Sequence, residues 1–325
     1  MENQSVLDAI DPELVERLAI RKAEIDRGSW ASPGIVAALA LGSVPVALAA
    51  LSKDLYGQGI SASIKGVLDF AFALEVFEDE FYLAVLGESS SAAQNAAFAP
   101  VRALAATVPG AINTIRQIEK HEKAHRATLL ATGATNVFGL SATSFDFTGG
   151  RGSSTPGPFA KATTDLAFLL QVAQAAEDTG VRAYKGQAAT LMPSPGILEA
   201  ALRIHSVEAR HASRIRRMRR AAAGAPSTVR YSGTVRGGER AAAGGTDLGP
   251  NPTAVGGALD KIYGAGANAT TAPSEGNTTH AGINVATGLA NAQFGTDAAQ
   301  EAFDEPLDRA DVIAIVQGFF IPTIA

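Results

Sequence analysis

The sequence predicts an all-α fold, an antiparallel four-helix bundle with one long crossover, preceded by an N-terminal helical segment and followed by a long irregular C-terminal arm. Three observations support this prediction. Four long segments repeat apolar residues at helical spacing. The connections between them are short, long and short, as such a bundle requires. Apolar residues make up 46% of the 325 residues and charged residues 18%, which is typical of a folded protein with a sizeable core.

The four helical segments make up a predicted domain over residues 61–222. An Ala-rich stretch with Pro100 and Pro109 joins the first two, and a tight PSPG turn joins the last two. Between the second and third, residues 133–159 are rich in Gly, Ser and Pro and have little helical character. The segments span residues 62–88, 108–132, 160–191 and 195–221.

Residues 1–60 are predicted to form an N-terminal helix followed by an apolar segment, 33–51. That segment is close to the lower length limit for a membrane span, and basic residues precede it as they precede the apolar core of an export signal. Gly42 and Pro45 would break a single helix. A buried helical hairpin is therefore the favoured interpretation, and an anchor or an export signal is the alternative; membrane contact is not favoured.

The C-terminal region, residues 223–325, is predicted to be an arm that ends in a docking helix. Residues 223–300 are dominated by Ala, Gly, Thr, Asn and Pro and show no helical or alternating pattern. Residues 305–319 have the pattern of a short amphipathic helix, with Pro306 near its start and Gly318 near its end. We expect this apolar end to pack onto the body of the protein.

Composition excludes several classes of function. The chain has no cysteine, which excludes disulfides, thiol nucleophiles, cysteine-ligated zinc and iron–sulfur clusters. Its net charge of -5 provides no overall basic field, so nucleic acid is not an expected partner. Histidine chemistry is limited to five residues.

Each helical segment has an apolar seam with a carboxylate in its middle. The first and third segments carry a glutamate with a tyrosine seven positions later, and the second and fourth carry Glu-x-x-His. Residues at these spacings lie on one face of a helix. In chain order the eight residues are Glu75, Tyr82, Glu122, His125, Glu177, Tyr184, Glu208 and His211.

Four carboxylates in one bundle centre would repel one another, and burial of each charge is costly. Two divalent metal ions remove this conflict, because Glu-x-x-His pairs and single glutamates on facing helices form the ligand set of dinuclear bundle sites. Oxygen ligands with imidazole favour iron or manganese. The predicted cofactors are therefore two iron or manganese ions, with the ligands Glu75, Glu122, His125, Glu177, Glu208 and His211.

Several assignments in this set have alternatives. Tyr82 and Tyr184 either donate hydrogen bonds to ligand carboxylates or are ordinary core tyrosines. Glu75 is preferred over Glu78 as a ligand because its spacing to Tyr82 recurs in the third segment. Glu78 to Glu80 are expected on a solvated helix face.

A minor alternative is a zinc hydrolase. Residues 121–125, HEKAH, match HExxH, in which two histidines bind zinc and the glutamate is the general base. In that interpretation Glu122 turns away from the metal. It leaves the second Glu-x-x-His and both Glu/Tyr repeats unexplained.

The sequence resembles the ferritin-like superfamily, and within it the group that includes bacterial and plant desiccation-related proteins. The resemblance implies a ferritin-like bundle in which the six residues above bind the metals. It also implies export to the periplasm, whereas a buried 33–51 helix would fit a cytoplasmic protein. The similar segments are LDFAFALEVFEDEFY (68–82), FDFTG (145–149), AEDTGVRAYKGQ (176–187), SVEARHASRIR (206–216) and EAFDEPLDRADVIAIV (301–316).

The expected function is that of a ferritin-like protein with a carboxylate-bridged dinuclear iron or manganese site. Fe(II) oxidation or peroxide consumption, with O2 or peroxide as the reacting partner, would serve oxidative or desiccation stress. The alternative is a structural or assembly protein, in which the bundle is a scaffold and the arms make contacts between subunits. A homo-oligomer is expected in both cases.

Overall fold

The computed structural model describes residues 60–222, 258–287 and 303–324. The chain divides into two compact units, Met1–Ile60 and Ser61–Ala325. The predicted N-terminal helix and apolar segment lie outside the described residues. Among the helices that are described, none is both long enough and apolar enough to cross a membrane.

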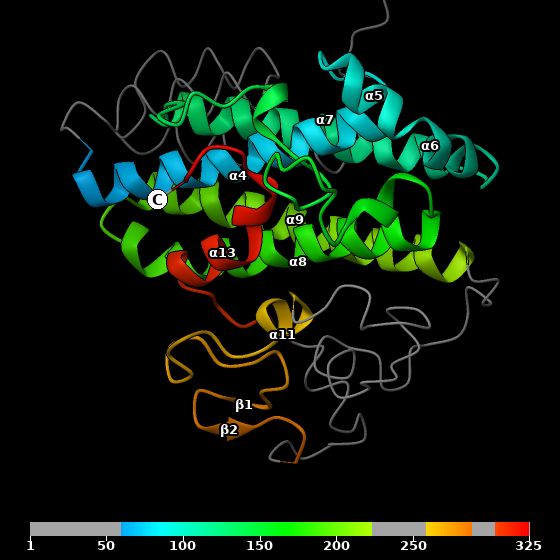
Figure 1. Cartoon of the computed structure of the whole chain (residues 1–325). Helices are drawn as coiled ribbons and strands as arrows, with labels where there is room; N and C mark the ends of the chain where they lie inside the picture. Colours follow the sequence, from blue (N-terminus) through cyan, green and yellow to red (C-terminus); the bar gives the residue numbers. More distant parts are fainter. Residues whose placement is uncertain (1–59, 223–257, 288–302, 325) are drawn as a thin grey trace, which may run out of the picture. The chain divides into compact units, whose positions relative to one another are not determined.

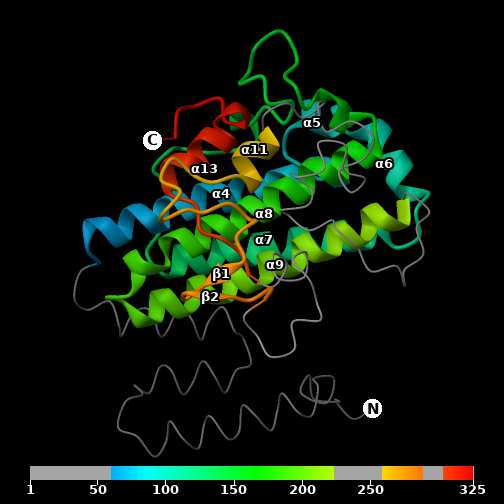
Figure 2. The same cartoon turned by 90° about the horizontal axis from the view of Figure 1, so that it is seen from below.

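Four long helices form the body of the second unit (Figure 1). Helix α4 packs mainly against α7, and α8 packs mainly against α9, with further contacts of α4 to α8 and of α7 to α9. Figure 2 shows the four running side by side. The predicted all-α bundle with one long crossover is confirmed. The helices are α4 (Ala62–Leu86), α7 (Ala111–Ala131), α8 (Leu166–Leu191) and α9 (Pro195–Ala222).

Local capping sets the ends of the helices. The Ser61 side chain accepts a hydrogen bond from the Ile64 amide at the start of α4, and Asp165 accepts one from the Phe168 amide at the start of α8. Such caps satisfy amides that have no partner inside the helix. Helix α4 ends at Gly87, whose φ of 79° is easily adopted only by glycine.

The connection between α4 and α7 is more helical than the sequence indicated. The Ala-rich stretch forms α5 (Ala92–Ala97) and α6 (Ala99–Ala106). Pro100 lies in the first turn of α6, where its missing amide hydrogen removes no helical hydrogen bond. The crossover between α7 and α8 is irregular, as predicted, and contains short 3₁₀ turns at Ala142–Ser144 and Ala160–Thr163.

An aromatic cluster ties the crossover and the chain end to α4. Phe77 of α4 lies with its ring centroid 5.9 Å from those of Phe145 and Phe147 and 5.2 Å from that of Phe319. Phe145 and Phe320 also form an isolated β-bridge. The FDF sequence of the crossover therefore supplies core aromatic side chains.

The described part of the C-terminal arm is more ordered than expected. It contains α11 (Ala258–Tyr263) and a small antiparallel hairpin of β1 (Thr279–His280) and β2 (Ile283–Asn284). The final helix, α13 (Arg309–Val316), begins later than the predicted residue 305 and packs against α8 and α11. A 3₁₀ turn, Gln317–Phe319, follows it.

Arg182 of α8 fastens this arm to the bundle. Its side chain is fully buried and forms an ion pair with the equally buried Glu275, with 3.0 Å between Nε and Oε1. The same guanidinium donates to the carbonyl oxygens of Glu305 at 2.9 Å and Pro273 at 2.8 Å. It also donates to the carbonyl oxygen of Gly264 at 3.0 Å, so one arginine binds three separate segments of the arm.

Candidate metal centre

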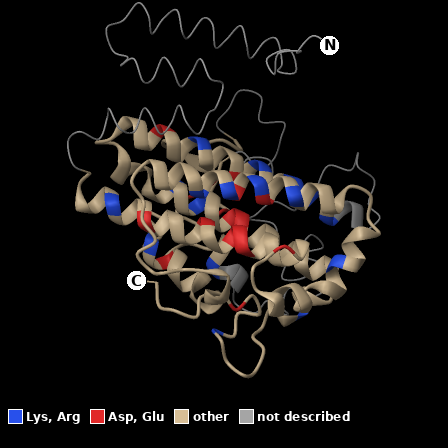
Figure 3. Ribbon diagram, turned by 90° about the horizontal axis from the view of Figure 1, so that it is seen from above, with Lys and Arg blue, Asp and Glu red and all other residues tan. Residues whose placement is uncertain are grey.

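The six predicted metal ligands meet inside the bundle. Glu75 comes from α4, Glu177 from α8, and one Glu-x-x-His pair from each of α7 and α9. All four glutamates have no exposed surface, and His125 and His211 are only 6% and 4% exposed. Acidic positions gather near the middle of the bundle in Figure 3. The fold therefore brings a charged cluster into the core.

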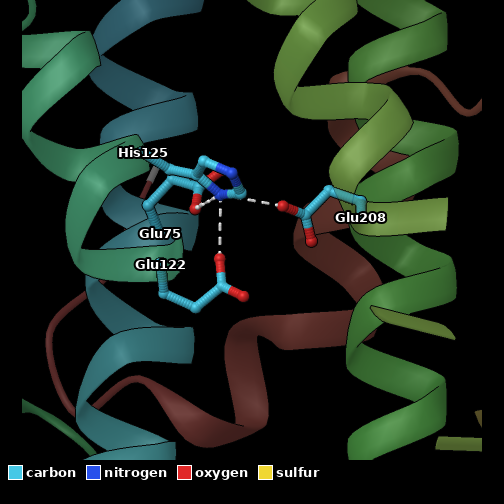
Figure 4. Close-up of side chains that lie close together, drawn as sticks. All are labelled: Glu75, Glu122, His125 and Glu208. Carbon is cyan, nitrogen blue, oxygen red and sulfur yellow. Dashed lines mark hydrogen bonds and ion pairs between the residues drawn. The ribbon is translucent and has the colours of Figure 1, made fainter. Parts of the chain in front are cut away.

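The first donor group surrounds His125. Its Nδ1 atom lies 3.1 Å from Oε2 of Glu75, 2.9 Å from Oε2 of Glu122 and 2.9 Å from Oε1 of Glu208. Figure 4 shows these three carboxylates, from three different helices, converging on one imidazole nitrogen. The four donor atoms lie within 4.8 Å of one another, a spacing that could hold a metal ion.

The second donor group surrounds His211 in the same way. Its Nδ1 atom lies 2.8 Å from Oε1 of Glu122, 3.1 Å from Oε2 of Glu177 and 3.9 Å from Oε2 of Glu208. These four residues also offer donor atoms within 4.8 Å of one another. The two groups share Glu122 and Glu208, and each shared carboxylate turns one oxygen toward either histidine. The two donor groups therefore lie side by side, with two carboxylates in common.

The two tyrosines cross-link the cluster. The hydroxyl of Tyr82 on α4 donates to Oε1 of Glu177 on α8. The hydroxyl of Tyr184 on α8 donates to Oε1 of Glu75 on α4, at 2.5 Å. Each tyrosine therefore orients the glutamate of the other helix. The second carboxylate oxygen of that glutamate faces a histidine.

Hydrogen bonding within the protein does not satisfy these carboxylates. Each Nδ1 atom carries at most one proton, yet three carboxylate oxygens crowd around it. Oε1 of Glu122 and both oxygens of Glu208 are buried without an accepted hydrogen bond from the described residues. Buried carboxylates in this state call for a cation. Hard oxygen donors with one imidazole each suit iron or manganese, so the residues present fit a dinuclear metal centre.

Raised pKa values indicate that, without metal, bound protons offset the negative charge of the carboxylates. Burial raises the pKa of Glu208 well above its usual value, and the charges of Glu122 and Glu75 raise it further. Burial raises the pKa of Glu122 to about 7 against the opposing effect of the histidines. Burial alone would lower the pKa of His211, but the charge of Glu177 raises it to about 11. Bound protons thus supply positive charge that metal ions can replace.

The expectation that Glu78 to Glu80 face solvent is wrong, because all three side chains are buried. Asp79 forms an ion pair with Arg126. Burial and the charge of Glu208 raise the pKa of Glu78 well above its usual value. Gly180 of α8 lies next to this carboxylate, since a Cβ atom at Gly180 would be in van der Waals contact with Oε1 of Glu78, at 3.5 Å.

The HExxH alternative does not fit this geometry. The Glu122 carboxylate points toward His125 and His211 rather than away from the donor atoms. His121 belongs to neither donor group in the described part of the chain; its Nδ1 atom lies 2.9 Å from Nε2 of His211. No spacing in the sequence predicts that contact, because the two histidines lie 90 positions apart; the HEKAH match is the one sequence signal at His121.

Comparison with known families agrees with the geometry. A family model described as a ferritin-like domain matches residues 64–221. Comparisons with curated proteins and with solved structures found no match. The matched range contains all six clustered glutamate and histidine residues and both tyrosines. Residues 64–221 of the chain therefore form a ferritin-like domain.

Proposed function

We propose that the protein holds two iron or manganese ions and carries out redox chemistry with O2 or peroxide, namely Fe(II) oxidation or peroxide consumption. The observation that carries this proposal is the pair of overlapping donor groups with Glu122 and Glu208 in common. The resemblance to desiccation-related proteins adds a stress role to the proposal. When bound, a pair of such ions would supply the one-electron steps of this chemistry.

The ligands of each ion follow from the two donor groups. The first ion would be held by Glu75 and His125, and the second by Glu177 and His211. The two shared glutamates would bridge the ions, as in other carboxylate bundles. Hydrogen bonds from Tyr82 and Tyr184 fix the terminal glutamates in orientation, which keeps the donor geometry in place while the charge at the centre changes.

The direct test is the metal content of the purified protein. Elemental analysis should find two iron or manganese ions per chain, and anomalous scattering should place them between His125 and His211. Addition of Fe(II) with O2 or peroxide should then give Fe(III) faster than in buffer. A chain with Glu122 and Glu208 both replaced by Ala is the control, and equal rates for the two proteins would exclude the redox proposal.

A second candidate is a structural protein in which the metal only staples the bundle. Complete burial of all four ligand glutamates favours it, because structural metal sites are closed whereas catalytic sites keep an open position. The two candidates differ in reactivity. A tightly bound metal that does not change oxidation state with O2 or peroxide would support the staple.

A further inference from the structure

One of the two cluster histidines has a second imidazole behind it. Nε2 of His211 lies 2.9 Å from Nδ1 of His121. The two rings are nearly parallel, with 8° between their planes and 5.1 Å between their centroids. His211 comes from α9 and His121 from α7, so the contact joins two helices beside the donor cluster.

The internal repeat has no equivalent contact on the other side. His121 directly precedes Glu122 in the first Glu-x-x-His pair, and the residue that directly precedes Glu208 in the second pair is Val207. A valine side chain has no hydrogen-bonding atom. This position of the repeat therefore provides a hydrogen-bonding ring from α7 for His211 on α9, but no such ring from α9 for His125 on α7.

We propose that His121 is a positioning residue that holds His211 ready for one of the two metal ions, and so makes the two metal positions inequivalent. This inference rests on the proposed function. His211 faces the carboxylates through Nδ1. A neutral imidazole that binds a metal through Nδ1 carries its proton on Nε2, and this N–H donates to Nδ1 of His121. The contact thus fixes both the tautomer and the orientation of the ligand.

The hydrogen-bonded chain continues outward to an exposed residue. When His121 accepts at Nδ1, its own proton lies on Nε2. That atom is 2.9 Å from Nε2 of Gln117, an amide nitrogen that can only donate; the amide flip that exchanges Oε1 and Nε2 places the acceptor that this proton needs. Gln117 is exposed and His121 is only partly buried. Substitutions here therefore leave the bundle core intact.

The test is a titration of the metal-free protein with Mn²⁺, in which calorimetry and electron paramagnetic resonance monitor each binding step. The wild-type chain should bind two ions. His121→Ala should weaken one binding step about 10–100-fold and leave the other unchanged, so that at intermediate Mn²⁺ the signal of uncoupled ions replaces that of a coupled pair. His121→Asn keeps an acceptor and should restore most of the affinity, whereas Lys120→Ala, an exposed change on the same helix, should have no effect.

A double-mutant comparison assigns the effect to one position. Glu177→Ala removes a ligand of the ion beside His211, so adding His121→Ala to it should change little. In a Glu75→Ala chain, which lacks a ligand of the other ion, His121→Ala should keep its full effect. Equal weakening of both steps, or no weakening, would overturn the role of His121 while leaving the dinuclear site intact. Failure of the wild-type chain to bind Mn²⁺ or Fe(II) would instead overturn the proposed function, and this inference with it.

Discussion

The two helix pairs of the bundle, α4 with α7 and α8 with α9, supply the same residue types in the same order and differ in what surrounds them. Each pair brings a glutamate, a tyrosine seven positions later, and a Glu-x-x-His. In the register of the repeat, Glu78 and Glu80 of α4 correspond to Gly180 and Arg182 of α8. The repeated positions form the candidate centre, whereas the differing positions fit each pair to its own neighbours.

The largest expected effect comes from removing a glutamate that both donor groups share, compared with one that belongs to a single group. Glu208→Ala should reduce the metal content from two ions to none, because this carboxylate belongs to both donor groups. Glu177→Ala should remove only one ion, since it belongs to one group. Elemental analysis after dialysis measures both, and an equal loss in the two variants would contradict the bridging assignment.

Arg182 tests the difference between the pairs, because it ties the arm to α8 at the position where α4 has Glu80. Arg182→Ala leaves Glu275 buried without its ion-pair partner, and breaking a buried pair typically costs about 3–5 kcal/mol of unfolding free energy. Denaturant unfolding measures this loss. Arg203→Ala is the matched control, because its pair with Glu199 is half exposed and such pairs contribute about 1 kcal/mol or less. A similar cost for both would show that the arm is not anchored by Arg182.

The tyrosines test whether the pairs brace each other. Tyr82→Phe should weaken the ion beside Glu177, and Tyr184→Phe the ion beside Glu75, each by about 10–100-fold as for other outer ligand contacts. Titration of each variant with Mn²⁺, combined with the Glu75→Ala and Glu177→Ala chains, shows which ion is affected. The assignment would be reversed if each tyrosine affected instead the ion bound by the glutamate of its own helix, Glu75 for Tyr82 and Glu177 for Tyr184.

The smallest effect concerns pH and involves Glu122, a residue that both donor groups share. The pKa of Glu122 in the metal-free protein is raised from 4.5 to about 7. The folded state therefore binds more protons than the unfolded state between these values, and unfolding free energy should fall as pH rises from 4.5 to 7. Mn²⁺ affinity should rise over the same interval, because metal must displace these protons. Unfolding curves with and without Mn²⁺ check both signs, and parallel profiles would count against proton displacement.

Much of this architecture could be predicted because it depends on local periodicity. The seams of the four segments placed Glu75, Glu122, Glu177 and Glu208 on inward faces, and the structure brings them together. What the sequence did not indicate depends on contacts between distant segments. The acidic run beginning at Glu78 resembles a solvated face in the sequence, and only the packing of the other segments against α4 shows that its side chains are buried.

The same limit applies outside the donor cluster. The role of Arg182 depends on carbonyl groups far along the chain, and no spacing rule links these segments. The contact of His121 with His211 likewise joins residues that are 90 positions apart. Patterns within one helix therefore predicted the residues of the donor cluster, whereas the contacts of His121 and Arg182 became visible only in three dimensions.

The distribution of the donor residues among helices also bears on when the protein could acquire metal during synthesis. Each donor group draws on α9, the last helix of the bundle to leave the ribosome. A nascent chain that ends before Glu208 has neither complete group, however well its earlier helices have formed. Binding of the proposed ions would thus be a late event, restricted to chains in which all four helices have assembled.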